Sequence, residues 1–130
     1  MNQDTICAIA TAQGGAIGCI RVSGPEAIEI TSRIFTPAAM GKKLKDSKPY
    51  TLTFGRIHEG SEIIDEVLVS LFRAPHSYTG ENSTEITCHG SVYILQKVLQ
   101  LLITNGCRMA QPGEYTQRAF LNGKMDLSQA

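Results

Sequence analysis

The sequence predicts an α+β fold, in which a mixed sheet with hairpins packs against helices. Short runs rich in β-branched residues recur along the chain between glycine-containing turns, as is typical of paired strands. Other stretches carry apolar residues at helical spacing. Because the hairpins are mixed with single helices, we expect an α+β arrangement.

The first two strands are predicted at residues 4–11 and 16–23. Gly14 and Gly15 lie between them, and glycines supply the positive φ angles of a tight hairpin turn. A phosphate-binding loop is the alternative interpretation. The segment matches neither the P-loop pattern nor GxGxxG, and a strand follows it instead of a helix, so the hairpin is favoured.

A helix is predicted from the turn at Gly24-Pro25-Glu26 to Phe35. We expect Ser23 to be the N-cap, because a serine hydroxyl accepts a hydrogen bond from a free N–H of the first turn. Pro25 suits the first turn, and Glu26 complements the positive end of the helix dipole.

Residues 36–49 hold proline, glycine and four lysines but few large apolar groups, so an exposed loop is predicted. The alternative is a basic patch that binds RNA directly through Lys42, Lys43, Lys45 and Lys48. The chain has 12 basic and 12 acidic residues. This zero formal charge, without a mixed aromatic and basic motif, favours the solvated loop.

A second hairpin is predicted from residues 50–59 and 63–73. A loop at 74–82 and a short strand at 83–90 follow it. These segments complete the strands of the predicted sheet, apart from one brief strand nearer the end of the chain.

A longer helix is predicted at residues 91–106, with Gly106 at the position after its C-cap. A brief strand at 107–111 and a short helix at 113–123 come next, and Asp126 is expected to cap a further helix.

Length and composition fit a single globular domain, since 130 residues with 42% hydrophobic residues can form one core. No apolar run approaches the length of a membrane span, and the N-terminus lacks a signal-peptide pattern, so a cytoplasmic location is expected. The four cysteines form no CxxC pair. We therefore expect reduced, buried thiols and no metal site.

Arg21 shares one face of its predicted strand with Ile17 and Cys19, because side chains alternate across a strand. Two interpretations stand. The side chain either reaches water along its aliphatic stem or pairs with a structural carboxylate, or it presents a guanidinium to an anionic or carbonyl-rich ligand.

Glu85, Thr87 and His89 share a face of the predicted strand at 83–90. This face is either solvated, or it presents Glu85 to a ligand with two adjacent N–H donors, such as a pterin or purine edge. His89 is interpreted as a hydrogen-bonded structural histidine, because no serine or cysteine nucleophile motif accompanies it.

Lys124 lies between Gly123, where a helix is predicted to stop, and Asp126. An exposed linker lysine is the simplest interpretation. Arg118 and Asn122 are close in sequence, so a positioned polar cluster at this turn is the alternative.

Three segments together resemble the N-terminal domain of the MnmE (TrmE) family of tRNA-modification GTPases: DTICAIATAQGGAIGCIRVSG, APHSYTGENSTEITCHG and QPGEYTQRAFLNGKMDLSQA. The resemblance covers nearly the whole chain, and SYTGE and RAFLNGKMDL are its most distinctive parts. It implies a fold like the tetrahydrofolate-binding domain of aminomethyltransferases. It also implies a folate-binding and dimerisation domain at residues 1–120, and a hinge with the start of a helical domain at 121–130.

The resemblance implies that Arg21, Glu85 and Lys124 contact 5-formyltetrahydrofolate. We expect Glu85 to accept hydrogen bonds from the pterin N–H edge, and Arg21 and Lys124 to meet acceptor oxygens or the anionic tail. No catalytic residue is expected in this chain. Gln111 stands where the family usually has arginine, so any role of that charge is open here.

For the full-length protein, the resemblance implies a homodimer that works with the flavoprotein MnmG. Together they would modify carbon 5 of the wobble uridine of tRNA. GTP, Mg²⁺ and K⁺ would bind in a GTPase domain outside this chain. The alternative function is an assembly module whose folate pocket is vestigial.

Overall fold

The computed structural model describes residues 4–12 and 14–124. Within them, one sheet has the strand order β3-β4-β5-β6-β2-β1-β7. Its strands are β1 (Ile6–Ile9), β2 (Ile17–Ser23), β3 (Phe35–Pro37), β4 (Leu52–Glu59), β5 (Glu62–Phe72), β6 (Ser83–His89) and β7 (Arg108–Met109). The helices are α1 (Ala27–Ile34), α2 (Val92–Thr104) and α3 (Glu114–Leu121), with a 3-10 turn η1 (Leu44–Asp46).

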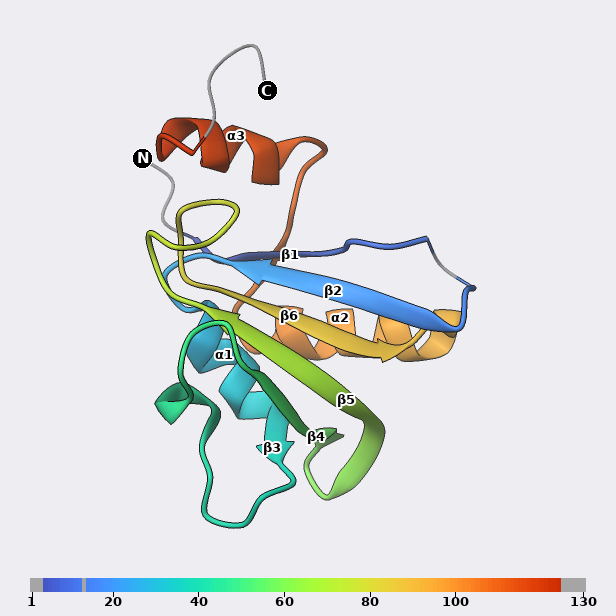
Figure 1. Cartoon of the computed structure of the whole chain (residues 1–130). Helices are drawn as coiled ribbons and strands as arrows, with labels where there is room; N and C mark the ends of the chain where they lie inside the picture. The colour runs from blue at the N-terminus through green and yellow to red at the C-terminus, as the bar shows by residue number, and fades with distance from the viewer. Residues whose placement is uncertain (1–3, 13, 125–130) are drawn as a thin grey trace.

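The sheet is mixed, since β1 pairs parallel with β7 and the other neighbouring strands pair antiparallel. Helices α1 and α2 lie on one side of it (Figure 1). Helix α3 lies on the other side, near β1 and β2 and the loop at residues 74–82 (Figure 1). The predicted α+β class is confirmed. We call the side that carries α3 the outer face.

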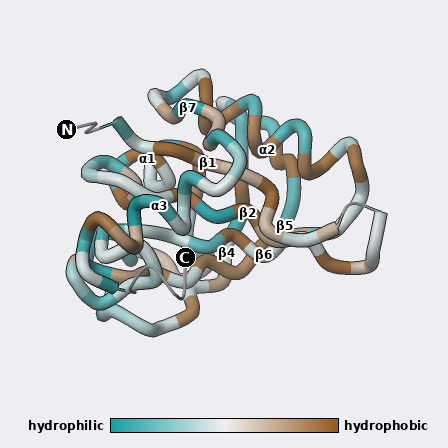
Figure 2. Tube along the Cα trace, turned by 90° about the horizontal axis from the view of Figure 1, so that it is seen from above, coloured by the Kyte–Doolittle hydropathy of each residue, from teal (hydrophilic) through white to brown (hydrophobic). Residues whose placement is uncertain are grey.

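The hydrophobic core lies between the sheet and helices α1 and α2. Leu95, Val98 and Leu102 of α2 are fully buried, at the spacing that places side chains on one helix face. They pack in the same core as Ile20 and Ile86 of the central strands. Figure 2 shows hydrophobic and hydrophilic residues alternating along α2, as expected for a helix with one face on a sheet.

Both ends of helix α2 are capped, and the C-terminal cap lies where the sequence predicts it. The Ser91 hydroxyl accepts a hydrogen bond of 3.1 Å from the backbone N–H of Ile94. Gly106 follows the C-cap Asn105 with a φ of +119°, a conformation that favours glycine over residues with a Cβ. These caps fix where the polypeptide leaves the helix and turns toward β7.

Ser23 is not the N-cap of α1, so this expectation was wrong. It is the last residue of β2, it is fully buried, and its hydroxyl donates a hydrogen bond of 2.8 Å to Glu81. Gly24, with a φ of +141°, turns the chain away before the helix begins. The hydroxyl of Thr5 instead accepts a hydrogen bond from the N–H of Glu26.

Residues 36–49 are a loop only in part. The segment Phe35–Pro37 pairs antiparallel with β4, and Leu44 is buried at the start of η1. Gly55 permits the pairing, because a Cβ there would lie 2.3 Å from the carbonyl oxygen of Thr36. A strand of three residues carries too little alternation to be recognised from sequence.

We predict that Leu102→Ala will lower the free energy of unfolding by about 3 kcal/mol, because it removes buried methyl groups and leaves a cavity. The neighbouring Ile103 is 43% exposed, so Ile103→Ala is expected to cost less than about 1 kcal/mol. Urea denaturation of both variants measures the difference. Equal losses would contradict the assignment of helix faces.

Candidate functional site

Arg21 and Glu85 lie directly opposite each other on the neighbouring strands β2 and β6. The Arg21 Nε donates to the Glu85 Oε2 at 3.1 Å, and the two side chains are 29% and 31% exposed. Their neighbours in the sequence, Ile20 and Ile86, are fully buried in the core. Successive side chains of a strand point to opposite faces of the sheet. The pair, called the strand pair below, therefore lies on the outer face.

Two tyrosine rings flank the guanidinium of the strand pair. The Arg21 Cζ lies 5.3 Å from the ring centroid of Tyr78 and 5.6 Å from that of Tyr115, within range of cation–π attraction. The Tyr115 hydroxyl donates to the carbonyl oxygen of Arg21 at 2.6 Å, and burial raises the pKa of Tyr115. Tyr78 comes from the loop at 74–82 and Tyr115 from α3, so two distant segments meet over β2.

Sequence reasoning did not select the two tyrosines. The signal available was indirect: Tyr78 lies in SYTGE, and Tyr115 lies in the third resembling segment. Neither sits in a strand pattern that would reveal its neighbours. Their approach to Arg21 depends on how α3 and the loop dock onto the sheet.

The strand pair retains free hydrogen-bonding capacity. Within the described residues, the Arg21 Nη groups and the Glu85 Oε1 have no hydrogen-bond partner. A carboxylate with a free oxygen accepts from N–H donors, and a guanidinium donates to oxygens. The adjacent tyrosine rings offer flat apolar surfaces. This combination fits a planar heterocycle with N–H donors and carbonyl acceptors, as a pterin has.

Lys124 lies beside the same loop but does not contact the strand pair within the described chain. A Cβ placed on Gly80 would lie 3.3 Å from the Lys124 Cγ and 2.7 Å from the Asn122 Cβ. Lys124 thus packs against the loop that carries Tyr78. Asp126, which was expected to cap a further helix, lies outside the described residues.

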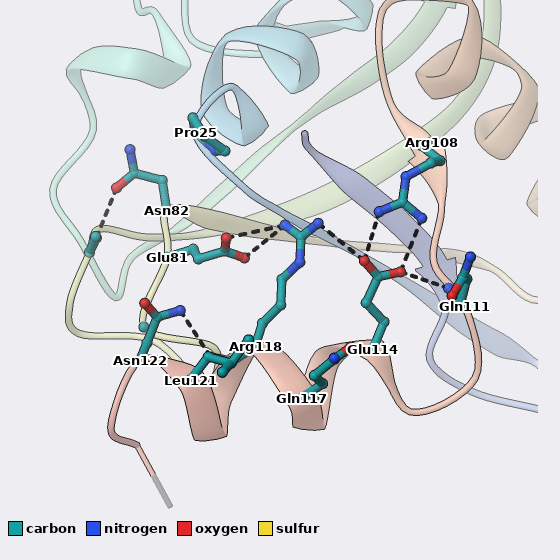
Figure 3. Close-up of a pocket in the computed structure, with 12 residues that line it drawn as sticks. Pro25, Glu81, Asn82, Arg108, Gln111, Glu114, Gln117, Arg118, Leu121 and Asn122 are labelled. Atoms are coloured by element: carbon teal, nitrogen blue, oxygen red, sulfur yellow. Dashed lines mark hydrogen bonds and ion pairs between the residues drawn. The ribbon is translucent and has the colours of Figure 1, made fainter. Parts of the chain in front are cut away.

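Arg118 forms the centre of an ion-pair network beneath α3 (Figure 3). Its side chain is 7% exposed, and its Nη1 donates to both Glu81 carboxylate oxygens at 3.3 and 3.1 Å. Its Nη2 donates to Asp4 at 3.1 Å and to Glu114 at 3.2 Å. Arg108 donates to the same two carboxylates, with shortest distances of 2.6 Å to Asp4 and 2.7 Å to Glu114.

The network keeps two of its carboxylates, Asp4 and Glu114, ionised. Hydrogen bonds from Arg108 lower the pKa of Glu114 to about 2, with further lowering by the Gln111 N–H and the nearby Arg118 charge. Hydrogen bonds from Arg108 also lower the pKa of Asp4. In return, hydrogen bonds to Asp4 and Glu114 raise the pKa of Arg108. At neutral pH Asp4, Glu114 and Arg108 are therefore charged.

The network fixes the loop at 74–82 against α3. Glu81 accepts from Arg118 and from the Ser23 hydroxyl of β2. The Asn122 Nδ2 donates to the carbonyl oxygen of Thr79 at 3.0 Å. Because these contacts bracket the end of the loop, they set the position of Tyr78 over the strand pair. Arg118 and Asn122 thus belong to a positioned polar cluster, the alternative given by the sequence.

A cleft of about 730 Å³ lies beside the network, between α3, the loop and the residues around Arg108. Figure 3 shows Arg118 extending between Glu81 and Glu114 at its wall. Both arginines are already engaged with carboxylates. The cleft therefore offers a ligand no unpaired arginine, in contrast to the strand pair.

His89 is confirmed as a hydrogen-bonded histidine. Its Nδ1 lies 2.7 Å from the Asp65 Oδ1, and its backbone N–H donates to Oδ2 at 2.9 Å. Its side chain is 72% exposed.

The four cysteines are free, and three of them are buried: Cys7, Cys88 and Cys107. Across residues 4–12 and 14–124, no three acidic, histidine or cysteine side chains gather to hold a metal ion.

We predict that stability will fall as pH drops from about 5 to 2, with a contribution of about 2 kcal/mol from Glu114. The pKa of the Glu114 carboxyl is lower in the folded state than in the unfolded state. Ionised Glu114 therefore stabilises the folded state above the ordinary pKa of a glutamate. This stabilisation is lost as the pH falls and the carboxylate of the folded state becomes protonated.

Urea unfolding measured across this pH range tests the assignment. Glu114→Gln should flatten the dependence. Glu66→Gln, which alters a side chain that is 59% exposed and lies 3.9 Å from Arg56, should follow the parent chain. An unchanged pH dependence in Glu114→Gln would refute the role of Glu114.

Helices in the described ranges are all too short or too polar to cross a membrane. Known relatives match the chain over all or nearly all of its length. It is 86% identical over 130 residues to a protein of Bacteroides thetaiotaomicron named tRNA modification GTPase MnmE. Proteins with the same name from Parabacteroides distasonis and Flavobacterium johnsoniae are 64% and 54% identical, over 97% and 100% of the chain.

The chain spans 28% of the length of each of these three relatives. The family described as "GTP-binding protein TrmE N-terminus" matches residues 5–124. That match includes the strand pair, both flanking tyrosines and Lys124. The chain belongs to the TrmE N-terminal family.

Proposed function

We propose that this chain is the folate-binding and homodimerising domain of a tRNA modification GTPase. The observation that carries the proposal is the strand pair between two tyrosine rings on the outer face of the sheet. It combines a carboxylate, a guanidinium and aromatic surfaces at one place. Such a set recognises a pterin ring, and the relatives are named for tRNA modification.

In this proposal, Glu85 accepts hydrogen bonds from the N–H edge of 5-formyltetrahydrofolate. Arg21 donates to acceptor oxygens of the ligand, and its contact with Glu85 holds both groups in register across two strands. Lys124 lies beside the loop that carries Tyr78, where it would attract the anionic tail. The domain thus binds and orients the folate, and the folate supplies the one-carbon chemistry.

The full-length protein is proposed to act with MnmG on carbon 5 of the wobble uridine of tRNA, in the cytoplasm. GTP, Mg²⁺ and K⁺ belong to its GTPase domain in this proposal. No residue of the present chain is assigned a catalytic role, since the strand pair suits binding and not proton transfer. Its contribution is to hold the one-carbon donor.

Homodimerisation is proposed to use the open part of the outer face. Leu52, Phe54 and Leu68 are 65%, 50% and 37% exposed, and Phe54 lies opposite Leu68 across β4 and β5. Apolar side chains gathered on an uncovered sheet face favour association with another protein surface. A second copy of this chain is the proposed partner. The alternative function, an assembly module with a vestigial folate pocket, would use the same face.

We predict that Glu85→Ala will weaken binding of 5-formyltetrahydrofolate at least tenfold. Each lost hydrogen bond to a charged group is worth about 1.5–3 kcal/mol, and about 1.4 kcal/mol corresponds to tenfold in affinity. Isothermal titration calorimetry measures the affinity, with circular dichroism as a check of folding. The matched control Glu66→Ala removes a carboxylate from exposed β5 and should bind like the parent chain.

Unchanged affinity in Glu85→Ala would contradict the site. No folate binding by a folded, dimeric parent chain would support the assembly-module alternative.

We predict that Phe54→Lys will weaken the dimer by at least tenfold, because it places a charge in an apolar contact. Sedimentation velocity over a range of concentrations gives the dissociation constant. Ile103→Lys is the control on the helix side of the molecule, where a partly exposed side chain of α2 is replaced. A dimer that responds to Ile103→Lys and not to Phe54→Lys would exclude the outer face.

A further inference from the structure

Six basic residues from three segments form one basic surface on the helix side of the sheet. The Arg73 Nη2, at the end of β5, donates to the carbonyl oxygen of Lys45 at 2.7 Å. Arg33 of α1 and Lys45 both approach Glu29, at 3.7 and 3.9 Å. The basic surface comprises Arg33, Lys42, Lys43, Lys45, Lys48 and Arg73.

A groove of about 370 Å³ runs along this surface, between α1 and the segment that leads from β3 to η1. Four of the basic residues line it: Arg33, Lys42, Lys43 and Lys45. Glu29 also lines it. The groove therefore brings basic residues of α1 and of the following loop together on one surface.

Glu29, which lines the groove, and Asp46, which lies between Lys45 and Lys48, offset only part of the positive charge of the six basic residues. Lys42, Lys43 and Lys48 are exposed, and within the described chain they form no ion pair. The contacts of Glu29 are long and exposed, and such pairs contribute little energy. The zero formal charge of the chain therefore hides a local excess of cations.

Another group of acidic residues lies away from the basic surface. Four acidic residues are carried by the end of β4 and by β5: Glu59, Glu62, Asp65 and Glu66. The separation gives the molecule a positive and a negative region. A polyanion would approach the first and be repelled by the second, so the charge distribution orients binding.

The side chains of the basic surface suit a phosphate backbone and not the reading of bases. Lysine ammonium groups bind phosphates as mobile point charges. Base recognition in single strands needs exposed aromatic rings for stacking. Phe35, the aromatic residue of the groove, is 3% exposed and belongs to the core. The contact is therefore independent of base sequence.

We propose that the basic surface binds the sugar–phosphate backbone of the tRNA substrate. The choice of RNA rests on the proposed function, because the relatives are named for tRNA modification. The surface lies near α1 and η1, on the side of the sheet opposite α3 (Figure 1). Backbone binding here leaves the strand pair open to folate.

Fluorescence anisotropy of the chain with labelled bacterial tRNA tests the proposal over about 50–200 mM KCl. Four lysine–phosphate contacts give a slope of log affinity against log salt of about −3. The Lys42→Gln/Lys43→Gln variant should weaken binding several-fold and make that slope shallower by about 2. Neither lysine side chain has a partner among the described residues, so folding is expected to be retained.

The matched control is Arg56→Gln/Lys97→Gln, which removes the same charge from residues paired with Glu66 and Glu59. It should keep the salt slope of the parent chain. Equal losses in both variants, an unchanged slope in Lys42→Gln/Lys43→Gln, or no tRNA binding by the parent chain would overturn the proposal. Binding to phosphatidylserine vesicles without binding to tRNA would overturn it in favour of a membrane surface.

Folate titration of the same variants separates this proposal from the proposed function. The Lys42→Gln/Lys43→Gln variant should bind 5-formyltetrahydrofolate like the parent chain. Loss of tRNA binding with intact folate binding supports the basic surface. If the Lys42→Gln/Lys43→Gln variant binds both folate and tRNA like the parent chain, the role of the basic surface is refuted and the proposed function is not.

Discussion

The arrangement of the outer face depends on the ion pairs of the buried Arg118 guanidinium. This guanidinium joins Asp4 before β1, Glu81 in the loop at 74–82, and Glu114 in its own helix. Helix α3 contributes one fully buried apolar residue, Ala119, so apolar packing alone provides little to hold it. Removing one partner from a buried ion pair leaves an uncompensated charge, and this penalty makes the arrangement specific.

The strand pair obtains its surroundings from this network. Alternation along β2 and β6 places Arg21 and Glu85 on the outer face, but that face would be an open sheet surface without α3 and the loop. The Arg118 network brings Tyr115 and Tyr78 over the guanidinium from both segments. A half-enclosed polar pair between rings suits the proposed binding of a ligand in one orientation, whereas an exposed ion pair is mostly solvated.

The two sides of the sheet therefore serve different purposes. Helices α1 and α2 supply the apolar core, which is the main source of stability. The outer face carries polar contacts that position a few side chains, and beyond them an uncovered apolar region. The cations gathered near α1 lie on the core side, so the proposed folate and RNA contacts do not compete for the same surface. In these two proposals, one sheet separates two binding tasks in a small domain.

The sequence by itself determined most of the local structure: the strands other than β3, the helix faces, the C-terminal end of α2 and the strand faces of Arg21 and Glu85. These follow from periods of two and 3.6 residues and from glycine geometry, which are local properties. Only the tertiary structure decided that Arg21 meets Glu85, Tyr78 and Tyr115. It also decided that Arg118 pairs with Glu81 and Asp4, which are 37 and 114 positions away in the sequence. It also made Ser23 a buried strand residue and Phe35–Pro37 an edge strand. These contacts depend on strand order, register and docking of α3, which a local pattern does not encode.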